Sequence, residues 1–332
     1  MNRRQWLASA GAAAGAAALG GTFGRVALAA APYPGRPIRL VVPFVAGTAP
    51  DAIARTISAE LGPVLGQPLV VENVGGAGGI IGARALKRAA PDGYTLGVLA
   101  NQHVINVHLY REPPFDPSRD FTAISALSGG PVVLAVPASS PYKTARELLD
   151  ALRKRPGALN YGSGGKGSVS HLAVETLLHN THTEAVHIPY KGANEILTAM
   201  ISGQTQFGMP VLSTAAPMIR QGQVRALAVS AAARSTHFPE VPTLAESLPP
   251  GFVLDNWSGL FAPAGLPAPI ARRLFEAVAA LQASGNLDAT MKANAGELRK
   301  SASPAQFAEM VAAETTRYGA LVAKIAMKGE AG

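Results

Sequence analysis

Short apolar runs alternate along the chain with longer segments in which apolar residues recur every fourth position. Ile38–Val42 is a mainly apolar run, typical of a buried strand. The next segment, Asp51–Leu61, carries Ile53, Ile57 and Leu61 on one face, which predicts a helix that ends at Gly62-Pro63. Strands are then predicted over Leu69–Asn73 and Tyr94–Leu99, with a helix near Ile80–Arg88 between them. This order is typical of an α/β fold with a parallel sheet between helices.

The rest of the chain continues the alternation. Further strands are predicted over Phe121–Leu127, Pro131–Pro137, Leu159–Tyr161, Val186–Pro189, Gln206–Val211 and Val224–Ser230. Further helices are predicted over Thr144–Lys154, from Val169 onward, and over Glu195–Ile201, Pro269–Ala283 and Pro304–Ile325. Ser128-Gly129-Gly130 is the expected crossing between two domains. The Pro-rich segment from Phe238 to Pro269 is expected to return over an irregular surface.

The first strand leads into a helix through a loop of small residues, Ala46-Gly47-Thr48-Ala49. Thr48 and Asp51 have the spacing of a capping box, and Pro50 suits the first helical turn. A helix that begins after such a loop presents backbone N–H groups without acceptors and the positive end of its dipole. We therefore predict that this loop forms half of a binding site for a small anion.

A second small-residue loop, Gly162–Ser168, precedes another predicted helix. Its glycines match G-x-G-x-x-G, but the match lies deep in the chain and Glu184 only approximates the acid that a dinucleotide site requires. Gly167 follows Lys166, so the loop is not a Walker loop either. We interpret it as a second helix start with Ser168 as N-cap and backbone N–H groups free for an anion. The alternative is a helix cap without a ligand.

Composition narrows the classes of function. The 332 residues suffice for two domains, and the 35 Gly and 26 Pro fit many tight loops. There is no Cys, which excludes disulfides, Cys-ligated metals and thiol catalysis. The formal net charge is +8, but no Lys/Arg run with interleaved aromatics occurs, so a nucleic-acid partner is not expected.

The N-terminus has the features of a cleaved secretory signal peptide, residues 1–29. A basic head containing Arg3-Arg4 precedes an Ala/Gly-rich apolar segment and the A-x-A signal Ala27-Leu28-Ala29. The arginine pair resembles a twin-arginine signal, and an ordinary Sec signal is the alternative. Cleavage would lower the net charge to +5, since these residues hold three arginines and no acid. We expect a mature protein that is exported and soluble.

Side-chain chemistry points to binding rather than catalysis. No G-x-S-x-G or H-E-x-x-H occurs. His179, His182 and His187 lie close together but lack an adjacent carboxylate pair, so no metal site is predicted. Lys191 either steers anions to a cleft or is an ordinary solvated lysine. Trp257 either walls a pocket or packs in the core.

The motifs together resemble the substrate-binding proteins of the tripartite tricarboxylate transporter family, the Bug receptors. The resemblance spans nearly all of the chain after the signal peptide, in the family's order, and as a set the motifs are highly specific. It rests on Tyr33–Phe44 with Ala46-Gly47 and Asp51, Leu65–Asn73, Gly76–Gly79, Pro91–Leu96, Tyr161–Ser163, Gly167-Ser168, His171–Ala173, His187–Gly192, Arg225–Val229, Val241–Thr243 with Glu246, Trp257–Leu260 and Ala262–Gly265.

The resemblance implies a type II periplasmic binding fold, with two α/β lobes, each a mostly parallel sheet flanked by helices, and a two-strand hinge. Lobe I would comprise residues 32–130 and 230–332, and lobe II residues 131–229. A monomer would capture a small carboxylate in the cleft and deliver it to the membrane permease subunits of the transporter. It would use no cofactor and perform no chemistry. A ligand-presenting partner of a sensor kinase is the alternative.

Family receptors typically hold a ligand carboxylate with backbone groups and ordered waters. By motif position the site residues would be Phe44, Ala46, Gly47, Thr48, Asp51, Gly162, Ser163, Gly164, Ser168 and His171. Lys191 is added because it could steer anions to the cleft. His171 would either contact the ligand or orient the loop. Two departures stand out: Thr48 replaces the usual second glycine of A-G-G, and Gly208 follows Phe207 where relatives often carry an acid. Thr48 could cap the helix or touch the ligand, and Gly208 makes an amino-acid ligand less expected.

Overall fold

The computed structural model describes residues 33–293 and 296–325, except the side chains of residues 289, 290 and 293. The predicted signal peptide lies outside the described residues. Residues from Arg36 onward form one compact unit. Among the described residues, no helix is long and apolar enough to cross a membrane.

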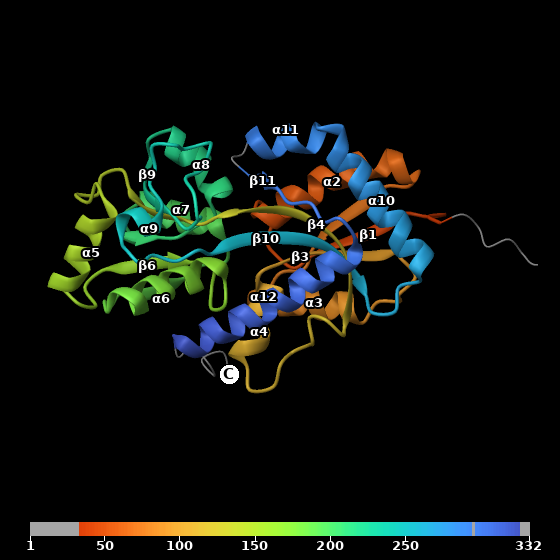
Figure 1. Ribbon diagram of the computed structural model, residues 1–332, viewed down its shortest axis with the longest axis horizontal. Helices are drawn as coiled ribbons and strands as arrows, with labels where there is room; N and C mark the ends of the chain where they lie inside the picture. Colours follow the sequence, from red (N-terminus) through yellow and green to blue (C-terminus); the bar gives the residue numbers. More distant parts are fainter. Residues whose placement is uncertain (1–32, 294–295, 326–332) are drawn as a thin grey trace, which may run out of the picture. The chain divides into compact units, whose positions relative to one another are not determined.

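Two mixed sheets organise this unit, each flanked by helices (Figure 1). The first has the strand order β11-β4-β10-β3-β1-β2 and the second β7-β6-β8-β5-β9. The strands of the first sheet are β1 Ile38–Val42, β2 Leu69–Asn73, β3 Thr95–Ala100, β4 Phe121–Pro131, β10 Asp255–Pro263 and β11 Glu297–Leu298. Those of the second are β5 Val133–Pro137, β6 Asn160–Ser163, β7 Val186–Pro189, β8 Phe207–Gly208 and β9 Val224–Val229. The two-lobed α/β architecture expected from the sequence is confirmed.

The helices flank the two sheets in separate groups. Those beside the first sheet are α2 Ala49–Leu65, α3 Ile80–Lys87 (after the short 3-10 turn η1 Ala77–Gly79), α4 Gln102–Leu109, α10 Ala268–Ser284, α11 Asn286–Ala293 and α12 Pro304–Lys324. Those beside the second are α5 Ala145–Lys154, α6 Val169–Thr181, α7 Ala193–Ile201, α8 Leu212–Arg220 and α9 Leu244–Ser247.

The βαβαβ start forms as predicted. β1 pairs in parallel with β2 and β3, and four of its five residues are buried. The run reads as almost continuously apolar because helices cover such strands on both faces. α2 is longer than predicted: Pro63 lies inside it, and the helix ends at Gly66, which adopts φ +76°. Gly66 rather than Gly62 takes the left-handed C-terminal position, which is why the predicted end was wrong.

The largest error concerns the Pro-rich segment from Phe238 to Pro269. It contains α9 and the nine-residue strand β10, which pairs antiparallel with β3 on one side and β4 on the other. The prolines near both ends of this strand are typical of loops, so its apolar run was not predicted as a strand. Gly259 lies within it because a Cβ there would be 2.1 Å from the Phe307 ring. Trp257 is fully buried beside the same ring, so its core interpretation holds.

Six other elements differ from prediction. β4 runs unbroken through Ser128-Gly129-Gly130, because these residues pair with β10. β8 is only two residues long. The helices α4 and α8 were not predicted, since α4 is rich in β-branched residues and α8 contains Pro217. The helix α11 and the two-residue strand β11 were not predicted either.

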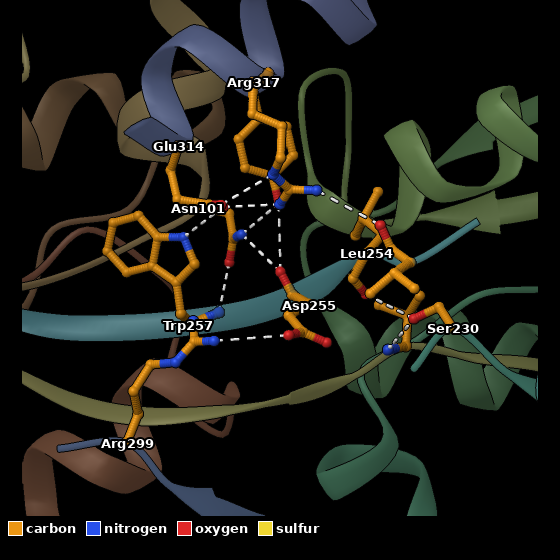
Figure 2. Close-up of polar contacts among 11 residues, drawn as sticks. Asn101, Ser230, Leu254, Asp255, Trp257, Arg299, Glu314 and Arg317 are labelled. Atoms are coloured by element: carbon orange, nitrogen blue, oxygen red, sulfur yellow. Dashed lines mark hydrogen bonds and ion pairs between the residues drawn. The ribbon is translucent and has the colours of Figure 1, made fainter. Parts of the chain in front are cut away.

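The chain passes between the sheets twice, from β4 to β5 and from β9 to β10. Ser230 joins the two crossings: its hydroxyl accepts from the Val132 N–H at 3.0 Å and donates to the Leu254 carbonyl at 2.6 Å (Figure 2). A two-strand hinge fits this arrangement. The exact lobe limits after residues 130 and 229 stay a prediction.

The C-terminal helix α12 braces β10 just beyond the second crossing. Asn101 donates to the Asp255 carbonyl at 2.9 Å and accepts from the Trp257 N–H at 2.7 Å. Tyr318 of α12 lies 2.6 Å from the Asn101 amide nitrogen. Figure 2 shows Glu314 of α12 reaching the Trp257 indole, 3.3 Å away. This buried network fixes the strand that reaches the cleft.

Candidate functional site

The loop between β1 and α2 is held by Asp51. This carboxylate is 3% exposed and accepts from the Gly47 N–H at 2.9 Å, from Arg55 Nε at 3.1 Å and from Asn73 Nδ2 at 2.9 Å. Burial alone would raise the pKa of Asp51, but the hydrogen bonds from Arg55, Gly47 and Asn73 outweigh it and lower that pKa. Asp51 therefore acts on the loop, whose Gly47 adopts φ +81°.

Thr48 occupies the N-cap position of α2, but its side chain does not cap the helix. Its hydroxyl donates to the Val45 carbonyl at 2.9 Å, and Asp51 binds the Gly47 N–H rather than that of Thr48. Thr48 is the N-cap, as its position indicates, but neither hydrogen bond of the predicted capping box forms. The methyl group of Thr48 faces Gly192 of the second lobe, 3.3 Å from where a Cβ would stand.

Replacing Asp51 by Asn should lower the free energy of unfolding at pH 7 by about 1–3 kcal/mol, because a charged acceptor of three hydrogen bonds is lost. The pKa of Asp51 is lowered on folding, so its stabilisation is present above the unfolded pKa and disappears as pH falls through the folded pKa. Urea unfolding of both proteins between pH 7 and pH 2.5 should show the difference shrinking below about pH 4. Asp150→Asn, at an exposed site, is the control. A constant difference at all pH values would contradict this role.

The second loop, Gly162–Ser168, folds on itself. Ser168 is the N-cap of α6 and accepts from the His171 N–H at 3.2 Å, which confirms that prediction. The other N–H groups of the loop bind internal acceptors: Gly164 to Ser170 Oγ, Gly165 to Ser163 Oγ, Gly167 to His171 Nδ1 and Ser168 to the Gly165 carbonyl. These four are not free for an anion as predicted, because neighbouring Ser and His side chains satisfy them. The N–H groups available at this helix start are those of Val169 and Ser170.

Two stacked histidines contact the second loop through Ser163 and Gly167. His171 and His187 have ring centroids 4.1 Å apart, and His187 Nε2 lies 2.6 Å from Ser163 Oγ. Burial, reinforced by the charges of His187 and Lys166, lowers the pKa of His171 to about 3. Burial and the charge of Lys166 lower the pKa of His187 to about 4. Both rings are neutral at pH 7, which leaves His171 Nδ1 able to accept from Gly167.

A cavity of about 70 Å³ lies between the two loops. Five helices begin at its wall, and their N-caps are Thr48, Asn101, Ser168, Gly192 and Val211. Its lining residues are Phe44, Thr48, Ala49, Pro50, Gln102, Gly164, Ser168, Val169, Ser170, Lys191, Gly192, Ala193, Ile196, Pro210, Val211, Thr214 and Asn256. None of these is acidic, and Lys191, an exposed residue, is the one cation among them. Asp51 and Glu195 lie in the first turns of α2 and α7, but neither lines the cavity. Helix N-termini at a wall without acidic side chains make the cavity favourable for an anion.

The structure brings together part of the predicted site. Phe44, Thr48, Gly164, Ser168 and Lys191 line the cavity, and Gly47 lines a neighbouring cavity of about 250 Å³. Ala46, Asp51, Gly162, Ser163 and His171 line neither. Gln102 and Asn256 were missed because α4 and β10 were not predicted. Gly192 and Thr214 were missed because only the two loops were considered.

The two lobes touch beside the cavity. Asn194 of α7 donates to the Gly47 carbonyl at 3.3 Å. Gly167 lies against α4 so tightly that a Cβ there would stand 2.6 Å from Leu109 Cδ1 and 2.7 Å from Asn106 Oδ1. Within the described residues, no group of three His, Asp or Glu side chains could hold a metal ion.

Residues 53–327 match the family model described as the tripartite tricarboxylate transporter family receptor. Rpa4515 of R. palustris, solved with adipate, is 32% identical, with a TM-score of 0.85 over 89% of this chain and 98% of that one. The periplasmic binding protein BugD is 30% identical, with a TM-score of 0.84 over 90% and 100%. MatC of Rhodopseudomonas palustris, solved with malate, is 32% identical, with a TM-score of 0.83 over 87% and 100%.

These likenesses extend over both lobes and the cavity between them, and they favour a transport receptor over a partner of a sensor kinase. The chain belongs to the tripartite tricarboxylate transporter receptor family, whose members include the Bug proteins.

Proposed function

We propose that this chain is an exported periplasmic receptor that captures a small carboxylate between its lobes. It delivers the ligand to the membrane permease subunits of a tripartite tricarboxylate-type transporter. The observation that carries the proposal is the convergence of five helix N-termini on a cavity without acidic side chains. Such an arrangement stabilises an anion whether or not an arginine is present.

In the proposed complex, the ligand carboxylate lies between the start of α2 in lobe I and the start of α6 in lobe II. Each helix N-terminus contributes about 0.3–1 kcal/mol toward an anion, and more where it is partly buried. The backbone N–H groups of Ala49 and Val169 donate to the carboxylate, since no residue one turn earlier in the helix accepts from them; Pro50, next in α2, has no N–H. Lys191 at the cavity draws anions toward the cleft.

The remaining predicted site residues act through the loops. Asp51 fixes the first loop through the Gly47 N–H. Ser163 and His171 fix the second loop through the Gly165 and Gly167 N–H groups. Ala46 lies in the turn of the first loop, and Gly162 lies in β6 just before the second loop. Adipate and malate in Rpa4515 and MatC support a carboxylate as the ligand class.

The receptor opens and closes about the two crossings that join its lobes. Lobe I comprises residues 32–130 and 230–332, and lobe II comprises residues 131–229. It works as a monomer, uses no cofactor or metal, binds no nucleic acid and leaves its ligand chemically unchanged. Residues 1–29 direct its export and are removed, so the mature protein is soluble in the periplasm.

Isothermal titration calorimetry of the ligand-free protein against citrate, malate, adipate, benzoate and nicotinate tests the proposal. At least one should bind with a Kd in the micromolar range or tighter, about −8 kcal/mol or better. Inorganic phosphate and glucose serve as controls for a non-carboxylate anion and a neutral solute. A folded, ligand-free protein that binds none of the carboxylates would contradict it.

A further inference from the structure

Asn256 is a buried amide at the site that sequence reasoning did not single out. It lies in β10, is 6% exposed, and lines both the site cavity and the neighbouring cavity of about 250 Å³. Successive side chains of a strand point to opposite faces. Trp257 packs against Phe307 of α12, so the Asn256 side chain lies on the opposite face, toward the cleft.

The Asn256 amide has no hydrogen-bond partner among the described residues. The other three buried amides are all bonded: Asn101 to the Asp255 carbonyl, Asn106 to the Gly78 carbonyl and Gln282 to the Ala126 carbonyl. An amide on a cavity wall without a protein partner binds water or a ligand there. Its place on the wall of two cavities indicates that this partner comes from the ligand.

The chemistry of an amide restricts that partner. The Asn side chain offers two N–H donors and one carbonyl acceptor, whereas a carboxylate can only accept. A second carboxylate on the ligand could accept from Asn256 Nδ2 but would leave Asn256 Oδ1 without a donor. No charged side chain lines the neighbouring cavity in the described part of the chain, so a second carboxylate there would have no cationic side chain as partner.

We propose that Asn256 determines specificity by binding an uncharged group of the ligand that both donates and accepts, a carboxamide or a hydroxyl. The preferred ligand is therefore a monocarboxylate with such a group at its other end. This inference rests on the proposed function, because the helix N-termini must hold the carboxylate. Thr48, Ala49 and Thr214 line both cavities with Asn256 and keep the uncharged group beside it.

Calorimetric titration with four-carbon acids isolates this group: succinamate, 4-hydroxybutyrate, succinate and butyrate. The wild-type protein should bind succinamate or 4-hydroxybutyrate at least about tenfold more tightly than succinate or butyrate. The stronger of the two identifies the group as carboxamide or hydroxyl. In Asn256→Leu, affinity for that ligand should fall to within about threefold of butyrate.

Thr56→Val is the matched control, because Thr56 lines the neighbouring cavity but its hydroxyl is bonded to the Ala52 carbonyl. It should keep the wild-type ranking. Tighter binding of succinate than of both uncharged analogues by the wild type would overturn the inference, whatever the variant does. So would an Asn256→Leu protein that folds and keeps the ranking. Failure of every carboxylate to bind would instead overturn the proposed function.

Discussion

Replacing Gly167 by Ala should lower carboxylate affinity by about 30–100-fold while the chain stays folded. The added Cβ would stand 2.6 Å from Leu109 and 2.7 Å from Asn106, both in the first lobe. Asn106 cannot easily move away, because its amide is bonded to the Gly78 carbonyl at 2.9 Å. We expect the clash to oppose the approach of the two lobes, and a loss of about 30–100-fold is equivalent to about 2–3 kcal/mol of binding free energy. Calorimetry gives the affinity, and small-angle scattering with ligand shows whether the variant still closes.

Gly165→Ala is the matched control for this prediction. Gly165 also has a positive φ, +93°, so the substitution introduces similar backbone strain. A Cβ there would meet only the Tyr190 carbonyl of the same lobe, at 3.7 Å. We expect its affinity to change less than about fivefold. Equal losses in the two variants would show that loop strain, not closure, causes the effect.

Replacing Gly259 by Ala should lower the free energy of unfolding by about 2–3 kcal/mol or prevent folding, the effect of overfilling a packed core. The new Cβ would lie 2.1 Å from the Phe307 ring, which packs against both Trp257 and Phe261. β10 is paired on both sides, so it cannot shift to relieve the clash. Urea unfolding followed by circular dichroism measures the loss.

Gly129→Ala provides the comparison in the adjoining strand β4, opposite Trp257. Its Cβ would meet its nearest atoms at 3.6 Å, an ordinary contact. The free energy of unfolding should change by less than about 1 kcal/mol. A Gly259→Ala protein as stable as Gly129→Ala would mean that α12 does not pack on β10 as described.

Elements whose apolar pattern matches their burial could be predicted from the sequence. β1 is an apolar run covered on both faces, and α2 buries Ile53, Ile57 and Leu61. β10 could not be predicted, because its flanking prolines and internal Gly259 are typical of loops and only the ring of Phe307, far along the chain, explains the glycine. Prediction failed where tertiary contacts, not local preference, select the conformation.

The site was predictable to the extent that it consists of local loop and helix-start chemistry. Ser168 is the N-cap of α6 that its sequence position indicates. Asp51 and His171 were assigned to the site, but both act on the loop backbone. Their orienting contacts come from residues distant in sequence: Asn73 donates to Asp51, and His187 stacks on His171. Gln102 and Asn256 reach the cavity only through helix and strand positions set by the whole fold.

A crystal structure of the protein with the tightest-binding carboxylate from the calorimetric series tests the central claim most directly. We expect the ligand in the cavity between the lobes, with its carboxylate within hydrogen-bond distance of the backbone N–H groups that begin α2 and α6. A ligand bound outside this cavity, or a carboxylate held by an arginine side chain away from the helix N-termini, would contradict the account.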